Sequence, residues 1–294
     1  MSSAANSVGI VGLGLIGTAL ARRLLAAGFS VVGYDVDAGR TEKLGRLGAH
    51  TAASVAQLGE QCGRVLIAVF DTSQVEQVIE GAQGLLSARE RHWLVLNVTT
   101  SDPARIAALS ARVAPRGIRL LEVPLSGTSE QVASGDGVGL IGGDECSYAA
   151  AADVLDAICP RRYHVGAIGS GAKAKLAVNL ILGLNRAALA EGIVFAESLG
   201  LDAAAFLKVA RGSAAYSQIM DVKGAKMIAR DFSPHGKLAQ HLKDVRLMLE
   251  HAERAGRTLP LMKTVEGLLE SCMSHGEGDL DNCAVIEAVR RSTR

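Results

Sequence analysis

The run Val8-Gly-Ile-Val-Gly-Leu-Gly-Leu-Ile-Gly17 contains the pattern that decides the fold. Residues 8–13 form a short apolar stretch typical of a buried strand, and the glycines of a GxGxxG motif follow at once. Residues 18–27 then show helical periodicity, and Gly28 is suited to end that helix. This order predicts a strand, a tight turn and a helix.

A second strand-like run at 29–34 completes the unit, and Asp35 closes it. Two parallel strands joined by a crossover helix are the natural arrangement of such a βαβ segment. A glycine-rich turn in this context predicts dinucleotide binding, because the helix N-terminus would face the pyrophosphate. The residues predicted to contact the dinucleotide here are Gly12, Leu13, Gly14, Leu15, Ile16, Gly17 and Asp35.

The acid at position 35 bears on the choice between NAD and NADP. Asp35 would accept hydrogen bonds from the adenosine ribose diol and would repel a 2′-phosphate, which favours NAD. Arg40 lies close enough in sequence to leave NADP open as an alternative.

Alternating strand-like and helical runs continue to about residue 168. Strands are predicted at 64–70, 93–98, 119–123 and 138–141, with helices at 73–79 and 103–113. The pattern then changes to long helices, beginning with one at 171–199. We therefore predict an α/β domain at 1–168 and an all-helical domain at 169–294.

Composition limits the classes of partner. The 294 residues include 31 Lys and Arg and 30 Asp and Glu, so no overall attraction to nucleic acid or to an anionic membrane is expected. The five cysteines are scattered without CxxC spacing, which disfavours a disulfide framework or a zinc site and favours the cytoplasm. The apolar stretch near the N-terminus is too short to span a bilayer, so we expect a soluble protein.

Leu121-Glu-Val-Pro-Leu-Ser-Gly-Thr128 places a hydroxyl and successive backbone N–H groups directly after a strand. A turn of this kind at the edge of a parallel sheet can bind a carboxylate. Taken alone, the segment is better interpreted as a strand-ending turn with a capping serine.

Lys175 and Asn179 lie four residues apart in a largely apolar helical run, so their side chains share one helix face. A lysine in apolar surroundings has reason to lower its pKa and to exchange protons near neutral pH. The alternative is a lysine on a solvated face, the interpretation that suits Lys173. His235 and His241 have a spacing that does not favour a metal site, and Lys243 with Asp244 fits a helix charge pair.

Together these segments resemble the β-hydroxyacid dehydrogenase family, which includes 3-hydroxyisobutyrate dehydrogenases and tartronate semialdehyde reductases and is related to 6-phosphogluconate dehydrogenases. Four ordered motifs carry the resemblance over nearly the whole chain: Gly12 to Gly17, Ser126-Gly127, Gly169-Ser-Gly171 with Lys175 and Asn179, and His241-Leu-Lys-Asp-Val-Arg-Leu247.

The resemblance implies a Rossmann-type domain, a long interdomain helix and an all-helical domain, assembled as a homodimer or homotetramer. It implies reversible hydride transfer between a small β-hydroxy acid and NAD, with NADP possible. Lys175 would be the general acid and base, and Asn179 would hold substrate or lysine in register. The remaining roles it implies are carboxylate binding by Ser126, Gly127 and Thr128, a place for Lys243 beside substrate or nicotinamide, and cofactor contacts by Val69, Phe70 and Thr100.

The chain departs from the family pattern mainly around the substrate. Thr128 and Gln131 stand where glycines are common, and Gly236 replaces a common aromatic. Val69-Phe-Asp71 replaces a common leucine-proline-asparagine stretch, and Asn97 replaces a frequent aspartate. An imine reductase and a non-catalytic nucleotide-binding regulator are the alternatives. Retention of Lys175 disfavours the imine reductase, and retention of Ser126, Lys175 and Asn179 together disfavours the regulator.

Overall fold

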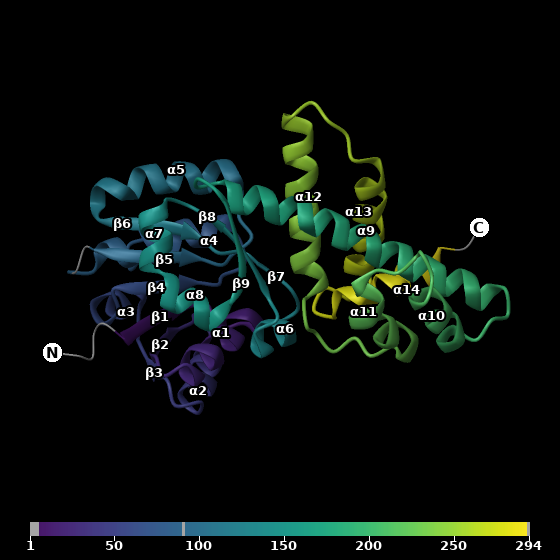
Figure 1. The fold of residues 1–294 in the computed structure, drawn as a ribbon, viewed down its shortest axis with the longest axis horizontal. Helices are drawn as coiled ribbons and strands as arrows, with labels where there is room; N and C mark the ends of the chain where they lie inside the picture. Colours follow the sequence, from purple (N-terminus) through teal and green to yellow (C-terminus); the bar gives the residue numbers. More distant parts are fainter. Residues whose placement is uncertain (1–5, 90–91, 293–294) are drawn as a thin grey trace. The chain divides into compact units, whose positions relative to one another are not determined.

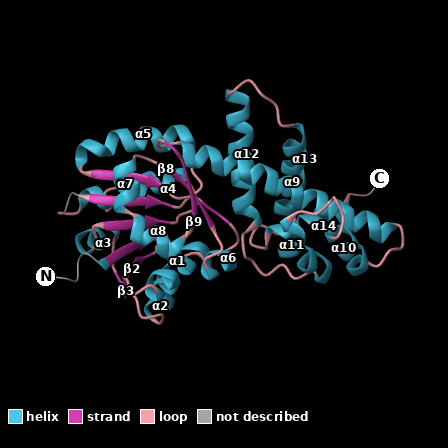
Figure 2. Ribbon diagram, in the orientation of Figure 1, coloured by secondary structure: helices cyan, strands magenta, loops and turns pink. Residues whose placement is uncertain are grey.

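The computed structural model describes residues 6–89 and 92–292. The chain forms two compact units, Met1–Lys175 and Leu176–Arg294. Strands and helices alternate in the first unit, whereas the second is built of helices (Figures 1 and 2). The predicted class, a Rossmann-type domain with a long helix and a helical C-terminal region, is confirmed.

The first unit is organised around one sheet with the strand order β3-β2-β1-β4-β5-β6-β8-β7, and β9 pairs with β8. Neighbours from β3 to β6 run parallel. The strands are β1 (Ser7–Val11), β2 (Ser30–Tyr34), β3 (His50–Thr51), β4 (Arg64–Ile67), β5 (Trp93–Asn97), β6 (Ile118–Glu122), β7 (Leu125–Ser126), β8 (Val138–Gly142) and β9 (Arg161–Gly166).

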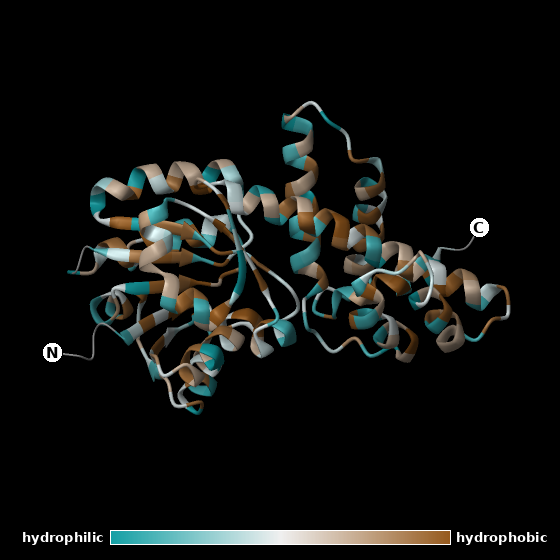
Figure 3. Cartoon of the chain, viewed as in Figure 1, coloured by the Kyte–Doolittle hydropathy of each residue, from teal (hydrophilic) through white to brown (hydrophobic). Residues whose placement is uncertain are grey.

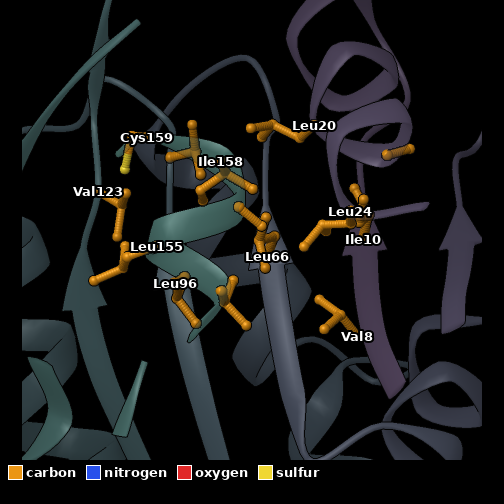
Figure 4. Close-up of a cluster of buried hydrophobic side chains, with 14 of the residues drawn as sticks. Val8, Ile10, Leu20, Leu24, Leu66, Leu96, Val123, Leu155, Ile158 and Cys159 are labelled. Carbon is orange, nitrogen blue, oxygen red and sulfur yellow. The ribbon is translucent and has the colours of Figure 1, made fainter. Parts of the chain in front are cut away.

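Helices cover both faces of this sheet because successive strand residues point to opposite sides and both sides are apolar. Leu66 packs on one face with α1 (Leu15–Ala26), α6 (Ser129–Ser134) and α8 (Ala152–Ile158), as Figure 4 shows for part of this cluster. Its neighbours Val65 and Ile67 pack on the other face with α3 (Val55–Gln61), α4 (Thr72–Glu80) and α5 (Pro103–Val113). The remaining helices of this unit are α2 (Ala38–Gly45), α7 (Glu145–Ala150) and short 3-10 turns at Leu85–Ser87 and Ala114–Arg116.

At the edge formed by β7, β8 and β9, the sheet differs from the sequence prediction. The predicted strand at 138–141 is β8, but it pairs antiparallel with β6 and β7. β9 was not predicted, because it is an edge strand of polar and partly exposed residues and lacks an apolar run.

The second unit is a helical bundle with its own core. Its helices are α10 (Ala203–Arg211), α11 (Gln218–Ala229), α12 (Leu238–Arg254), α13 (Pro260–Ser274) and α14 (Val285–Arg291), with a 3-10 turn at Asn282–Ala284. The long helix α9 (Ser170–Ser198) begins in the first unit and continues into this one.

The helix α9 is long and apolar enough to cross a membrane by length and composition alone, and its central part is strongly apolar in Figure 3. Ala172 belongs to the core of the first unit, whereas Leu189, Ala190 and Ile193 belong to the core of the second. The helix therefore contributes side chains to the core of each unit.

A buried ion pair ties together three segments of the helical unit. Lys223 on α11 donates to both carboxylate oxygens of Asp281, at 2.7 and 2.9 Å. Asp281 also accepts the backbone N–H groups of His235, Gly236 and Cys283. Burial alone would raise the pKa of Asp281, but the Lys223 ammonium and these hydrogen bonds hold that pKa below its usual range.

Replacing Asp281 by asparagine is expected to destabilise the protein by about 3–5 kcal/mol, because it leaves the Lys223 ammonium buried without its counter-charge. The free energy of unfolding in urea would measure this. Asp279→Asn is the matched control, since Asp279 forms a solvent-exposed pair with Lys237 and should change stability by about 1 kcal/mol or less. Equal effects of the two changes would contradict the prediction.

Candidate active site

Most of the predicted site residues of the first unit follow the carboxyl ends of the parallel strands. They therefore lie at the C-terminal end of the sheet. Strand order reverses between β1 and β4, with β2 and β3 on one side and β5 and β6 on the other. At such a switch point the loops after neighbouring strands diverge and leave a crevice for a ligand. The glycine turn follows β1, Asp35 follows β2, Val69 follows β4 and Thr100 follows β5.

The glycine turn leads directly into α1 and leaves its N-terminus open. Gly12 has a positive φ of 93°, and a side chain at Gly17 would overlap the Gly12 carbonyl. Around Gly14, by contrast, a Cβ would meet no atom within 4 Å. Gly14 precedes α1 without a side-chain cap, so backbone N–H groups of the first helical turn face this open space. The turn therefore fits a pyrophosphate group.

Asp35 is tied to this turn and to the residues that follow it. The Leu13 N–H donates to Asp35 Oδ2 at 2.7 Å, and the Asp37 N–H donates to Oδ1 at 2.9 Å. Arg40 Nη1 lies 3.5 Å from Oδ2, and Arg40 Nε lies 3.4 Å from Asp37 Oδ2. The carboxylate thus has a structural role in the turn while retaining lone pairs for a ribose hydroxyl, and a half-exposed guanidinium stands beside it.

The loops after β4 and β5 are joined through a threonine hydroxyl. The Val69 N–H donates to Thr99 Oγ1 at 3.0 Å, and that hydroxyl lies 3.1 Å from the Val69 carbonyl. The Phe70 N–H donates to Gln74 Oε1, and the Phe70 side chain is partly exposed. Thr99 is buried between the loops, whereas its neighbour Thr100 was the residue predicted to line the cofactor.

The predicted carboxylate turn contains a capping box. Thr128 Oγ1 accepts the Gln131 N–H at 3.2 Å, and Gln131 Oε1 accepts the Thr128 N–H at 2.9 Å. The Thr128 backbone donor is therefore occupied, although the expectation was of successive available N–H groups. Ser126 ends β7 and Gly127 has a positive φ of 146°. The Ser126 and Thr128 hydroxyls and the Gly127 N–H are further donor groups of this turn.

Lys175 is held against this same turn. It is buried, and its Nζ donates to the Leu125 carbonyl at 2.7 Å, one residue before Ser126. The helix that carries it is anchored by Glu122, which accepts the N–H groups of Gly169, Gly171 and Ala172. Burial raises the pKa of Glu122 to about 7, against these hydrogen bonds and Lys173, which lower it.

The predicted residues of the helical unit contact one acid, Asp244. Asn179 Nδ2 donates to Asp244 Oδ2 at 3.0 Å, and Lys243 Nζ lies 2.8 Å from Asp244 Oδ1. Both Asn179 and Asp244 are buried. The Lys243–Asp244 charge pair, which the sequence suggests on a helix surface, therefore includes a buried carboxylate. Lys175 and Asn179 are four residues apart on α9, in the order that the sequence predicts.

Leu125 and Asp244 contact predicted site residues, and Glu122 contacts the start of the helix that carries two of them. None of the three was predicted from the sequence to have a role at the site. An acid inside the predicted strand 119–123 is a signal for Glu122, because a buried carboxylate requires hydrogen-bond partners. Leu125 acts through its carbonyl, which no sequence pattern marks. Residues 6–89 and 92–292 contain no group of three or more His, Cys, Asp or Glu suited to a metal ion.

Two family models match nearly all of the chain. One describes the NAD-binding domain of 6-phosphogluconate dehydrogenase and matches residues 7–166. The other describes the NAD-binding domain of NADP-dependent 3-hydroxyisobutyrate dehydrogenase and matches residues 169–289. The chain belongs to the β-hydroxyacid dehydrogenase family.

Individual relatives agree over the full length. The chain is 31% identical to L-threonate dehydrogenase of Cupriavidus necator, covering 96% of this chain and 95% of the relative. It is 30% identical to 2-hydroxy-3-oxopropionate reductase of Escherichia coli, covering 96% of each. The crystal structure of 3-hydroxyisobutyrate dehydrogenase from Salmonella typhimurium superposes with a TM-score of 0.88 at 27% identity, over 96% of this chain and 99% of that one.

This β-hydroxyacid dehydrogenase is therefore an NAD(P)-dependent oxidoreductase that acts on CH–OH groups. Imine reductases, the alternative enzyme class, are structurally less similar to this chain. A Pseudomonas imine reductase superposes with a TM-score of 0.65 at 20% identity over 97% of this chain and 99% of that one, a likeness of fold alone.

Arg40→Ala is expected to lower the affinity for NADP about three- to tenfold relative to NAD, because a partly exposed guanidinium beside Asp35 would attract a 2′-phosphate. Binding of each reduced cofactor, followed by fluorescence, would measure the ratio. Arg46→Ala serves as the control, since Arg46 follows α2 and pairs with exposed Glu42. An unchanged ratio in the Arg40 variant would show that the guanidinium does not face the ribose.

Proposed function

We propose that this enzyme interconverts a small β-hydroxy acid and its aldehyde or keto acid, with Lys175 as the general acid and base. The observation that carries the proposal is the buried Lys175 amine, which hydrogen-bonds the Leu125 carbonyl beside the Ser126-Gly127 turn. A hydroxy acid requires an amine close to a turn that can bind its carboxylate, and this hydrogen bond places the amine one residue from Ser126.

Bound nicotinamide supplies the hydride acceptor in oxidation and the hydride donor in reduction. Lys175 has the complementary task of moving a proton. In oxidation its neutral amine takes the proton of the substrate hydroxyl as the C–H bond breaks, and in reduction its ammonium protonates the alkoxide oxygen. The Leu125 carbonyl accepts a hydrogen bond from Nζ and so fixes the direction of the amine in either protonation state.

The substrate carboxylate would be bound by the Ser126 hydroxyl, the Gly127 N–H and the hydroxyl of Thr128. Asn179 is oriented by Asp244, which leaves its amide oxygen to accept from the substrate or from Lys175. Lys243 would lie near the substrate or the nicotinamide, with Asp244 balancing its charge.

The dinucleotide would be held by the turn from Gly12 to Gly17, by Asp35, and by Val69, Phe70 and Thr100. We place the enzyme in the cytoplasm as a homodimer or homotetramer. Exposed apolar side chains on α9, at Ile181 and Phe195, and directly after it, at Leu199, support assembly with further copies of the chain.

Short hydroxylated acids are the proposed substrates, with NAD as the preferred cofactor and NADP as the alternative. Relatives named for L-threonate and 2-hydroxy-3-oxopropionate support this choice. The wild-type enzyme should reduce NAD or NADP with at least one of 3-hydroxyisobutyrate, glycerate, threonate and serine. Absence of turnover across this panel, with cofactor still binding, would contradict the proposed substrate class.

Lys175→Ala should lower kcat by at least about a hundredfold, because a general acid and base typically contributes that much or more. Cofactor affinity should stay within about twofold. Lys173→Ala is the control on the same helix, since Lys173 is exposed, and its turnover should be nearly normal. A near-normal rate in the Lys175 variant would remove the proposed mechanism.

Gln131→Ala tests the carboxylate turn. It releases the Thr128 N–H from Gln131 Oε1, and this donor then becomes available to a substrate carboxylate. We expect KM for the hydroxy acid to fall about three- to tenfold, within the range for a hydrogen bond to a charged group, with kcat changed less. Ser134→Ala, at the other end of α6, is the control for weakening the helix. A KM that is unchanged or higher would place the carboxylate away from Thr128.

A further inference from the structure

The segment from β6 to β7 contacts α9 at two points, and both points bear on Lys175. Glu122 ends β6 and accepts hydrogen bonds from the N-terminus of α9, whereas the Leu125 carbonyl, three residues later, accepts Lys175 Nζ. Lys175 lies three residues after Ala172, the last of the backbone donors to Glu122. One short stretch of chain therefore fixes both the helix start and the lysine head group.

The geometry around Glu122 shows a carboxylate used as a helix cap from another element. Gly169 precedes α9, and its N–H donates to Oε2 together with the Gly171 N–H at 3.3 Å. The Ala172 N–H donates to Oε1 at 2.9 Å. These are donors that a helix leaves without intrahelical acceptors, and a negative charge at this end is favoured by the helix dipole.

Close packing leaves the carboxylate little freedom to move. A Cβ at Gly142 on β8 would overlap Glu122 Oε2, and it would lie 2.6 Å from the Gly171 nitrogen. A Cβ at Gly171 would lie 2.8 Å from the Leu140 carbonyl and 3.0 Å from Glu122 Cβ. Glu122 itself is 1% exposed. The two glycines allow β6, β8 and the start of α9 to meet around one carboxylate.

We infer that Glu122 is a positioning residue for the reaction: by holding the first turn of α9 on β6, it sets the place of Lys175 Nζ against the Ser126-Gly127 turn. This inference rests on the proposed role of Lys175 in proton transfer. Glu122 contacts neither substrate nor cofactor in this account and acts through the helix and the lysine.

The test replaces Glu122 by glutamine and by aspartate. Glutamine keeps the size of the side chain but places an NH2 group where one backbone N–H needs an acceptor. Aspartate keeps the carboxylate, but its side chain is one methylene shorter. Both variants should lower kcat about 10- to 100-fold, the order expected for a misplaced reacting group, with cofactor affinity within about twofold. Amide hydrogen exchange in residues 167–176 should become about tenfold faster.

A double-mutant cycle with Lys175→Ala separates positioning from a general effect on the fold. Glu122→Gln should change the residual rate of the Lys175→Ala enzyme by about twofold or less, because its effect passes through the missing amine. Ser54→Ala is the control for loss of a helix cap in the same domain: it removes the side-chain acceptor of the Gln57 N–H on α3 and should leave kcat unchanged.

Two results would overturn the inference. One is a normal kcat in the Glu122 variants although amide exchange is faster. The other is a fold-loss of kcat in the double variant that equals the product of the losses in the two single variants. If glutamine prevents folding, the aspartate variant supplies the same cycle. Failure of the proposed function gives a different result, because Lys175→Ala alone would then retain activity. In that case the positioning role is also overturned, while hydrogen exchange still reports whether Glu122 holds the helix.

Discussion

The backbone N–H groups at the start of α9 need acceptors, and three of them belong to the buried residues Gly169, Gly171 and Ala172. Glu122 provides both carboxylate oxygens to three of these groups. The alternative, buried donors without acceptors, would cost about 1–3 kcal/mol for each group. The helix that carries Lys175 and Asn179 therefore begins where it does because an acid ends β6. The close approach of Gly142 and Gly171 follows from the same requirement.

Sequence reasoning was most reliable where a local rule fixes an element at both ends. The helix predicted at 103–113 is α5 at Pro103–Val113, since Asp102 caps it and proline suits its first turn. The long helix predicted at 171–199 is α9 within one residue at each end. The short helices α2, α3 and α6 to α8 were missed, because six to eight residues give too little periodicity. β9 depends on its pairing with β8, which local sequence does not encode.

At the site, the sequence likewise indicates which residue types are present but not which groups contact them. Glycine spacing and an acid at the end of β2 point to the dinucleotide turn, but they do not reveal that the Leu13 N–H already donates to Asp35. Likewise the four-residue spacing places Asn179 after Lys175, but the acceptor that orients its amide, Asp244, comes from α12, 65 residues later. Candidate site residues can be selected from the sequence. The groups that orient their side chains come from strands and helices that are distant in sequence.

The capping box at Thr128 shows how local stability and ligand binding compete for the same atoms. A short helix such as α6 gains from reciprocal hydrogen bonds at its start, since its few residues supply little other stabilisation. The Thr128 N–H that Gln131 accepts is also a donor that a carboxylate in this turn would use. Glycine at both positions would leave the donor available and the helix start uncapped. Here the donor stabilises α6, so under the proposed function the substrate carboxylate would depend more on the Ser126 and Thr128 hydroxyls, whose direction can adjust to the ligand. Under the proposed function, substrate selection in this enzyme is therefore expected to depend on whether Gln131 keeps the Thr128 N–H occupied.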